Sequence, residues 1–322
     1  MSYKSIKGQD SAVAFLQISI ARGTVAHAYI FHGPQGAGKF STAVQFAKAL
    51  NCHAPQDGAP CDVCPSCVKI EKVSHPDLIV ARQGNETSIG IDDIRDVIHA
   101  VGLKPFEARY KVCIIDGAGL LTQQASNALL KTLEEPPPFS VIILIAEKAH
   151  GLYRTIVSRA QVVRFDALTA EVIRSILTEK YGISPEKAKI LARFSSGGID
   201  ASRADAPEKF LDMREGLTRA LALGTFLESD YDAMPKEESR VVLDMMLTWY
   251  RDIIMEKAAL GPEALMHEDK REALAREAAG TSWDRLYGIT EKIIEMRDIL
   301  KGNVNTKLAM HMMGFETLAQ ER

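Results

Sequence analysis

The chain has 322 residues, of which 46% are hydrophobic and 25% charged, and its formal net charge is −3. This is ordinary globular composition, long enough for two or three domains with real cores. The charge excludes nucleic-acid binding by bulk electrostatics alone, because neutralising phosphates requires clustered Lys and Arg, although a local basic patch stays open. The polar N-terminus lacks a signal-peptide pattern, and the longest apolar run, residues 141–146, is too short to cross a bilayer, so we expect a cytoplasmic protein.

Up to Asp166, short apolar runs alternate with segments of helical periodicity. Asp10 or Ser11 is expected to cap the first helix, and three prolines beginning at Pro136 end the last one. Because the apolar runs contain almost no polar residue, they indicate a parallel α/β sheet covered on both faces. The predicted strands are 28–32, 78–81, 112–115, 141–146 and 161–165, and the predicted helices are 11–21, 39–50, 91–101 and 125–135.

The character of the sequence changes after Asp166. Residues 169–205 predict two or three short helices, and from about Pro207 only helical periodicity is found. We therefore expect an α/β domain at 1–166, a small helical domain at 167–206 and an all-helical domain at 207–322. The helices expected in the last domain are 208–228, 236–259, 263–279, 282–301 and 305–319.

A glycine-rich phosphate-binding loop lies between the first strand and the helix that follows it. Residues 33–40 read Gly-Pro-Gln-Gly-Ala-Gly-Lys-Phe, which matches G-x-x-x-x-G-K-[ST] except for Phe40. Backbone N–H groups of such a loop surround a phosphate, and the lysine reaches the terminal phosphates. The strand 112–115 leads into the aspartate of a second nucleotide motif. The candidate nucleotide-binding residues are Gly33, Gly36, Gly38, Lys39, Ser41 and Asp116.

Two elements of ATP hydrolysis are missing from this site. Phe40 stands where a Ser or Thr hydroxyl would hold Mg²⁺, and Ser41 points roughly 100° further around the helix. Gly117 follows Asp116 where a Glu would polarise the attacking water, although Asp116 could still hold Mg²⁺ through water. We therefore expect no hydrolysis by this chain alone. Whether the loop binds ATP or ADP, or is retained only as structure, stays open.

Four of the five cysteines are close together, with the spacing Cys52-x8-Cys61-x2-Cys64-x2-Cys67. Four thiolates suit a tetrahedral Zn²⁺, and a closed four-sulfur site leaves no position for substrate, so we predict a structural zinc. An iron–sulfur cluster is an alternative, as is a redox pair, although a pair would leave two cysteines without a role. His75 could replace one ligand. Cys113, alone in an apolar strand, is expected to be a small buried hydrophobe.

Together these features resemble the bacterial sliding-clamp loader subunits of the AAA+ class over nearly the whole chain. The most specific segment is Asn-Ala-Leu-Leu-Lys-Thr-Leu-Glu-Glu-Pro-Pro at 127–137. Residues 6–9 and 27–31 resemble the N-terminal box of the family, and the bacterial subunits share the four-cysteine insertion. Ser158-Arg159-Ala160 matches the Ser-Arg-Cys motif with its Cys replaced, and residues 305–308 resemble part of the helical collar.

The departures from the family pattern imply a particular type of subunit. The catalytic gamma or tau type carries Ser or Thr after the loop lysine, Glu after the strand aspartate, a polar sensor near Ala146 or Glu147 and a sensor arginine where Asp200 falls. Their loss resembles the delta-prime type, described in this family as a rigid, non-hydrolysing stator. The resemblance implies that Arg159 is an arginine finger supplied in trans to a neighbouring ATP site.

The resemblance also implies the partners. They would be the gamma or tau and delta subunits of a DNA polymerase III clamp loader, the sliding clamp, and primed DNA. An active gamma- or tau-type ATPase subunit is the first alternative. A metal- or thiol-dependent protein, with the cysteine cluster as its active centre, is the second.

Overall fold

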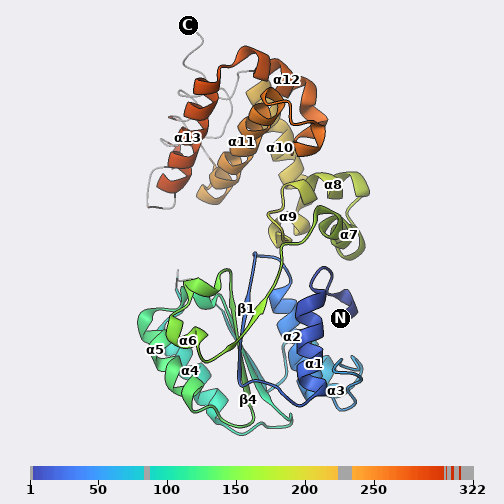
Figure 1. Cartoon of the computed structure of the whole chain (residues 1–322), viewed down its shortest axis with the longest axis vertical. Coiled ribbons are helices and arrows are strands. Elements are labelled where there is room, and N and C mark those ends of the chain that lie inside the picture. The colour runs from blue at the N-terminus through green and yellow to red at the C-terminus, as the bar shows by residue number, and fades with distance from the viewer. Residues whose placement is uncertain are drawn as a thin grey trace. The chain divides into compact units, whose positions relative to one another are not determined.

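A computed structural model describes residues 3–82, 88–223 and 234–300, together with residues 302, 306, 307 and 312. The chain forms two compact units (Figure 1). The first unit comprises residues 1–180 and 195–201, and the second comprises residues 181–194 and 202–322. Within the described ranges, no helix is long and apolar enough to cross a membrane.

The first unit is built on a five-stranded parallel sheet with the strand order β2-β3-β4-β1-β5. This confirms the predicted parallel α/β fold. The strand order places β1 between β4 and β5, so that the loop after β1 leaves the interior of the sheet. The strands are β1 (Ala28–His32), β2 (Leu78–Arg82), β3 (Lys111–Asp116), β4 (Ser140–Ala146) and β5 (Gln161–Arg164).

Helices cover both faces of this sheet (Figure 1). On one face, Tyr29 and Phe31 pack with residues of α1 (Asp10–Ala21), α2 (Lys39–Asn51) and α3 (Pro65–Glu71). On the other face, alternate strand residues pack against α4 (Ile91–Gly102), α5 (Gln123–Glu134) and α6 (Arg154–Val157). Successive strand residues point to opposite faces, which is why these strands had to be apolar throughout. Short 3-10 turns lie at Tyr3–Ser5, Ala118–Leu120 and Ala149–Gly151.

The predicted cap of the first helix is wrong. Helix α1 begins at Asp10, and Gln9 is the N-cap residue without a side-chain capping bond. The Gln9 amide instead donates to the backbone carbonyl of Asp166 (2.8 Å) and accepts from the Asp166 N–H (3.1 Å). Gln9 therefore joins the start of the chain to the end of β5, a partnership between distant residues that local capping rules do not include.

Helices dominate the chain after β5. Three short helices, α7 (Ala170–Tyr181), α8 (Pro185–Arg193) and α9 (Ala201–Asp205), lie where two or three were predicted. They are followed by α10 (Pro207–Ala222), α11 (Lys236–Lys257), α12 (Arg271–Gly280) and α13 (Trp283–Ile299). The end of the predicted helix 208–228 and nearly all of 305–319 lie outside the described residues. The division into three domains stays a prediction.

The helix predicted over 263–279 is only partly present. The chain forms two short 3-10 turns, Pro262–Ala264 and Glu268–Lys270, before α12 begins at Arg271. Between the turns, His267 is buried and donates its backbone N–H to the buried Asp252 carboxylate (2.7 Å). This tertiary hydrogen bond holds the backbone out of the helix, and nothing in the local sequence marks the break.

Candidate functional site

The phosphate loop connects the end of β1 to the start of α2. Gly33, Gly36 and Gly38 all have positive φ angles, of 149°, 73° and 92°. A Cβ on Gly33 would lie 2.2 Å from the Phe165 carbonyl oxygen, and a Cβ on Gly36 would lie 2.2 Å from that of Ile199. Only glycine combines this backbone conformation with such close contacts. Gly38 is the N-cap residue of α2, so the loop ends where backbone N–H groups point away from the helix.

A second glycine segment packs on the loop within the same unit. The Ile199 N–H donates to the Gly36 carbonyl (3.0 Å), and a Cβ on Gly198 would lie 1.8 Å from the Gln35 carbonyl oxygen. Judged from sequence alone, Gly197-Gly198 indicates only a break between helices. These glycines support the phosphate loop through a tertiary contact between segments that are far apart in the sequence.

The loop lysine is folded against its own loop. Lys39 is buried, and its Nζ donates to the carbonyl oxygens of Gly33 and Pro34, both at 2.6 Å. Burial lowers the Lys39 pKa, while the carboxylates of Glu147 and Asp116 partly offset that effect. The Lys39 ammonium thus donates to two loop carbonyls and lies near two carboxylates, Asp116 at the end of β3 and Glu147 just after β4.

The remaining predicted nucleotide residues lie at the same end of the sheet. Ser41 is half-buried in the first turn of α2, and Asp116 is the last residue of β3. Sequence reasoning missed Arg82, the last residue of β2. The Arg82 Nε lies 3.4 Å from Asp116 Oδ2, and its guanidinium carbon lies 4.0 Å from the centre of the Phe40 ring. Only the register of β2 against β3 brings these residues together.

Arg159 lies far from this loop. It comes just before the first residue of β5, whereas the phosphate loop follows the last residue of β1. Because neighbouring parallel strands start at the same edge, the two sites are separated by the length of a strand, roughly 16 Å for five residues. Arg159 donates to the Thr155 carbonyl (2.9 Å) and forms an ion pair with Glu134 at the end of α5 (2.7 Å).

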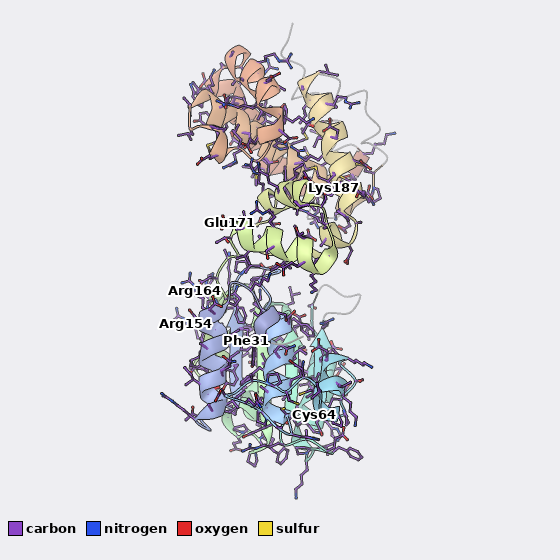
Figure 2. The ribbon with its side chains drawn as sticks, turned by 90° about the vertical axis from the view of Figure 1, so that its right-hand side faces the viewer. Phe31, Cys64, Arg154, Arg164, Glu171 and Lys187 are labelled. Carbon is purple, nitrogen blue, oxygen red and sulfur yellow. The ribbon has the colours of Figure 1, made fainter. Side chains whose placement is uncertain are left out.

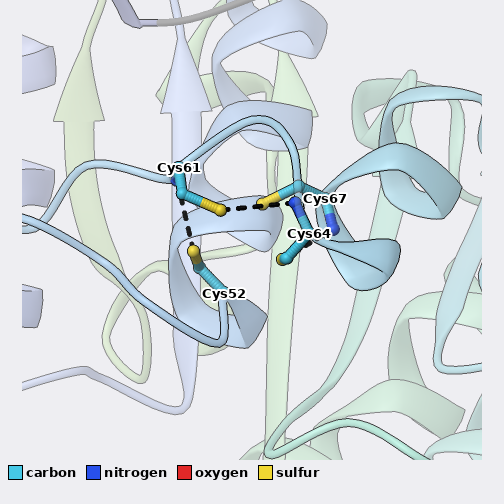
Figure 3. Close-up of side chains that lie close together, drawn as sticks. All are labelled: Cys52, Cys61, Cys64 and Cys67. Atoms are coloured by element: carbon cyan, nitrogen blue, oxygen red, sulfur yellow. Dashed lines mark hydrogen bonds between the residues drawn. The ribbon is translucent and has the colours of Figure 1, made fainter.

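The four clustered cysteines come together as predicted (Figure 3). Their sulfur atoms all lie within 4.8 Å of one another. Each backbone N–H of Cys61, Cys64 and Cys67 donates to the sulfur of the preceding cysteine in the cluster, at 3.2, 3.4 and 3.5 Å. This spacing suits a single tetrahedral ion, whose sulfur ligands lie about 2.3 Å from the metal.

The surroundings shift the pKa values of three of these thiols in different directions. Backbone N–H groups of Val63 and Cys64 lower the pKa of Cys61 to about 6. Burial raises the pKa of Cys52 and of Cys67. A positive charge at the centre would favour the thiolate form of the sulfurs around it. His75 is outside this group, because its Nδ1 accepts the Asp77 N–H (3.0 Å) and its Nε2 lies 3.4 Å from Ser66 Oγ.

The cysteine cluster is remote from the phosphate loop. Helix α2 begins at Lys39 and ends just before Cys52, and its 13 residues span roughly 20 Å. Arg164, the last residue of β5, pairs with His32, the residue just before the loop. Figure 2 shows Cys64 and Arg164 toward opposite ends of the first unit, with Phe31 of β1 between them. The cluster can therefore brace the unit but cannot take part in chemistry at the loop.

Comparison with known proteins gives the family of this chain. Residues 8–169 match the family model described as DNA polymerase III, delta subunit, which covers half of the chain. The chain belongs to this family. Residues 208–313 of this family member also match the model of the C-terminal part of the delta subunit. The resemblance to clamp-loader subunits inferred from the sequence is thus confirmed.

Individual relatives include more than one type of subunit. The chain is 29% identical over 311 residues to "DNA polymerase III subunit delta'" of Bacillus subtilis, covering 93% of each protein. It is 32% identical over 306 residues to "DNA polymerase III subunit tau" of the same organism, covering 85% of this chain but only 54% of tau. The family member thus spans about half the length of that tau. A solved gamma subunit-related protein from Thermotoga maritima aligns with a TM-score of 0.48 and 18% identity, covering 97% of this chain and 100% of that one.

Proposed function

We propose that this chain is a delta-prime-type stator of a DNA polymerase III clamp loader. It does not hydrolyse ATP, it offers Arg159 to the ATP site of a neighbouring subunit, and it helps to place the sliding clamp on primed DNA. Its partners are gamma or tau subunits, delta, the clamp and the DNA. Coverage of the Bacillus subtilis delta' along 93% of both chains supports this choice, whereas the relationship to tau covers about half of tau.

The position of Arg159 is the observation that carries this proposal. It lies at the edge of the sheet opposite its own phosphate loop, so its guanidinium cannot serve a nucleotide bound there. Its side chain is 34% exposed and that of Glu134 is 51% exposed. Exposed ion pairs of this kind contribute about 0–1 kcal/mol to stability. Arg159 can therefore leave Glu134 and pair with a phosphate of the ATP bound by a neighbouring subunit, at little cost in free energy. An arginine at such a site stabilises charge on the transferring phosphoryl group.

The test is reconstitution of the whole clamp loader with Arg159→Ala. Turnover at the neighbouring site is expected to fall by on the order of 10³ or more, and the total DNA-stimulated ATPase rate by the share of that site. Clamp loading is expected to fall with it. The isolated chain should show no ATPase activity with or without the substitution, because Phe40 and Gly117 remove the metal-holding hydroxyl and the water-orienting carboxylate.

Arg154→Ala is the matched control. Arg154 is exposed on the short helix α6, which ends two residues before Arg159, and it is labelled in Figure 2. Its loss should leave assembly, ATPase rate and clamp loading unchanged. Unchanged rates in Arg159→Ala, with normal assembly, would remove the finger assignment. A loss of assembly in both variants would show that α6 holds the complex together rather than reaching an ATP site.

We further propose that Cys52, Cys61, Cys64 and Cys67 hold a structural zinc ion. The four sulfurs converge at one point, and the distance from the phosphate loop argues against a role in the reaction. A bound ion would tie the end of α2 to the start of α3. Metal analysis should find one redox-silent zinc per chain, whereas a coloured or redox-active centre would favour an iron–sulfur or thiol function.

An active ATPase subunit is the second candidate, favoured by the 32% identity to tau over 85% of the chain. It would require Ser41 or water to serve the metal, and a residue other than Gly117 to orient the attacking water. The purified chain would then hydrolyse ATP, and Lys39→Ala would abolish the turnover. That result would reject the stator proposal.

A further inference from the structure

A guanidinium cation occupies the place between Phe40 and Asp116. Arg82 and Asp116 are directly paired residues of the parallel strands β2 and β3, and each is the last residue of its strand. Phe40 is in the first turn of α2, directly after the loop lysine. The Arg82 guanidinium contacts both, with its carbon 4.0 Å from the ring centre and its Nε 3.4 Å from the carboxylate.

The same two positions hold Mg²⁺ in hydrolysing phosphate-loop proteins. There a Ser or Thr hydroxyl after the lysine and the strand-end aspartate bind the ion, which demands oxygen ligands at about 2.0–2.1 Å in octahedral geometry. In this chain the ring of Phe40 offers no oxygen, and the Asp116 carboxylate already faces a cation. The residues present therefore do not fit a magnesium site.

We propose that Arg82 takes the place of the divalent ion at this phosphate loop. An aromatic face and a carboxylate are both favourable partners of a guanidinium, which stacks on rings and pairs with carboxylates. The ion pair alone would be weak, because the side chains of Arg82 and Asp116 are 54% and 33% exposed. The Phe40 ring therefore matters: its replacement of the hydroxyl both removes a metal ligand and adds a surface that holds the arginine.

The consequence concerns which ligand the loop accepts. The positive-φ glycines and the N-terminus of α2 remain as a cradle for phosphate, and Arg82 adds a positive charge next to Phe40 of that helix. A nucleoside diphosphate or triphosphate would then bind without a divalent cation, and no metal would be present to promote phosphoryl transfer. This extends the proposed absence of hydrolysis in this chain and does not depend on Arg159 or on any partner.

The first experiment measures metal binding by the isolated full chain. Electron paramagnetic resonance of Mn²⁺, a stand-in for Mg²⁺, is recorded on the zinc-loaded protein with and without ADP. The wild type and the control Arg95→Ala, which removes an exposed arginine of α4, should retain no Mn²⁺ beyond that bound by ADP alone. The double variant Phe40→Ser with Arg82→Ala should gain a Mn²⁺ signal, which a further Asp116→Asn change should remove.

The results decide the proposal in either direction. Tight Mn²⁺ binding by the wild type that depends on Asp116 would overturn it, and so would a well-folded double variant that gains no Mn²⁺. Circular dichroism establishes that each variant is folded. These measurements involve no partner subunit. They can therefore reject the role of Arg82 without affecting the trans role of Arg159, and loss of the Arg159 assignment would leave the Arg82 proposal intact.

The second experiment measures ADP binding by calorimetry in EDTA and in excess Mg²⁺. For the wild type we expect affinities that differ by less than about twofold, and for Phe40→Ser with Arg82→Ala at least a tenfold gain on adding Mg²⁺, about 1.4 kcal/mol. A wild-type affinity that rises tenfold with Mg²⁺ would contradict the proposal. A wild type that binds no ADP in either condition would refute the inferred metal-free ligand site.

Discussion

Lys48 is a buried cation that joins the phosphate-loop helix to the cysteine insertion, and Lys48→Met tests that role. Its side chain is 1% exposed, and its Nζ lies 2.5 Å from Asp62 and 2.7 Å from Glu71. Burial opposes the charge of Lys48, but the bonds to Asp62 and Glu71 outweigh it and raise its pKa, so the lysine is charged in the folded protein. Methionine keeps most of the side-chain volume and leaves two carboxylates facing each other.

The expected cost follows from the exposure of the partners. Removing one member of a fully buried ion pair costs about 3–5 kcal/mol, because the other charge is left without compensation. The Asp62 and Glu71 side chains are 29% and 32% exposed, so water relieves part of this penalty. We therefore expect a loss at the lower end, about 3 kcal/mol, which corresponds to a fall in Tm of roughly 4 °C for a chain of this size.

Scanning calorimetry of the zinc-loaded full chain is the assay. Lys48→Met combined with Glu71→Leu should recover part of the loss, because one of the two carboxylates that lost the Lys48 ammonium is removed. Lys69→Met is the control, since Lys69 pairs with Glu107 on the surface and should cost less than about 1 kcal/mol. A Lys48→Met variant as stable as the control would refute the claim that this ion pair braces the insertion.

Three further predictions concern other parts of the first unit. Burial opposes ionisation of Asp77, but N–H bonds from residues 106–108 and the charge of Lys111 outweigh it and lower its pKa. The stabilisation of the fold by ionised Asp77 is therefore present above about pH 4 and lost as the pH falls through the lowered pKa. In urea titrations, Asp77→Asn should lose about 2 kcal/mol of unfolding free energy at pH 7, and its stability should depend less on pH in the acid range. Gly198→Ala should expose the Ile199 amide to hydrogen exchange, because its Cβ would lie 1.8 Å from the Gln35 carbonyl, whereas Gly102→Ala, with no atom within 4 Å, should not. A strong chelator should release one zinc per chain and reduce the helical circular-dichroism signal from α3, and Cys113→Ala should leave the zinc content unchanged.

The elements of the first unit were largely predictable because their signals are local. Fully apolar runs bounded by polar turns specify buried strands, and each predicted strand is present within one or two residues. The phosphate loop and the four cysteines were also found from spacing alone, since each set lies within a short stretch of sequence. The prediction of the helical region was less accurate where a tertiary hydrogen bond changes the backbone, as at His267, whose backbone N–H donates to the Asp252 carboxylate.

The sequence by itself determined the sheet, the glycine loop, the missing hydroxyl at Phe40 and the family to which the chain belongs. Only the tertiary structure decided what surrounds these features. It placed Arg82 between Phe40 and Asp116, and it set Arg159 at the edge of the sheet opposite the phosphate loop. The physical reason is that strand order and register bring together residues far apart in the chain, and a local sequence pattern does not specify which strands will be neighbours.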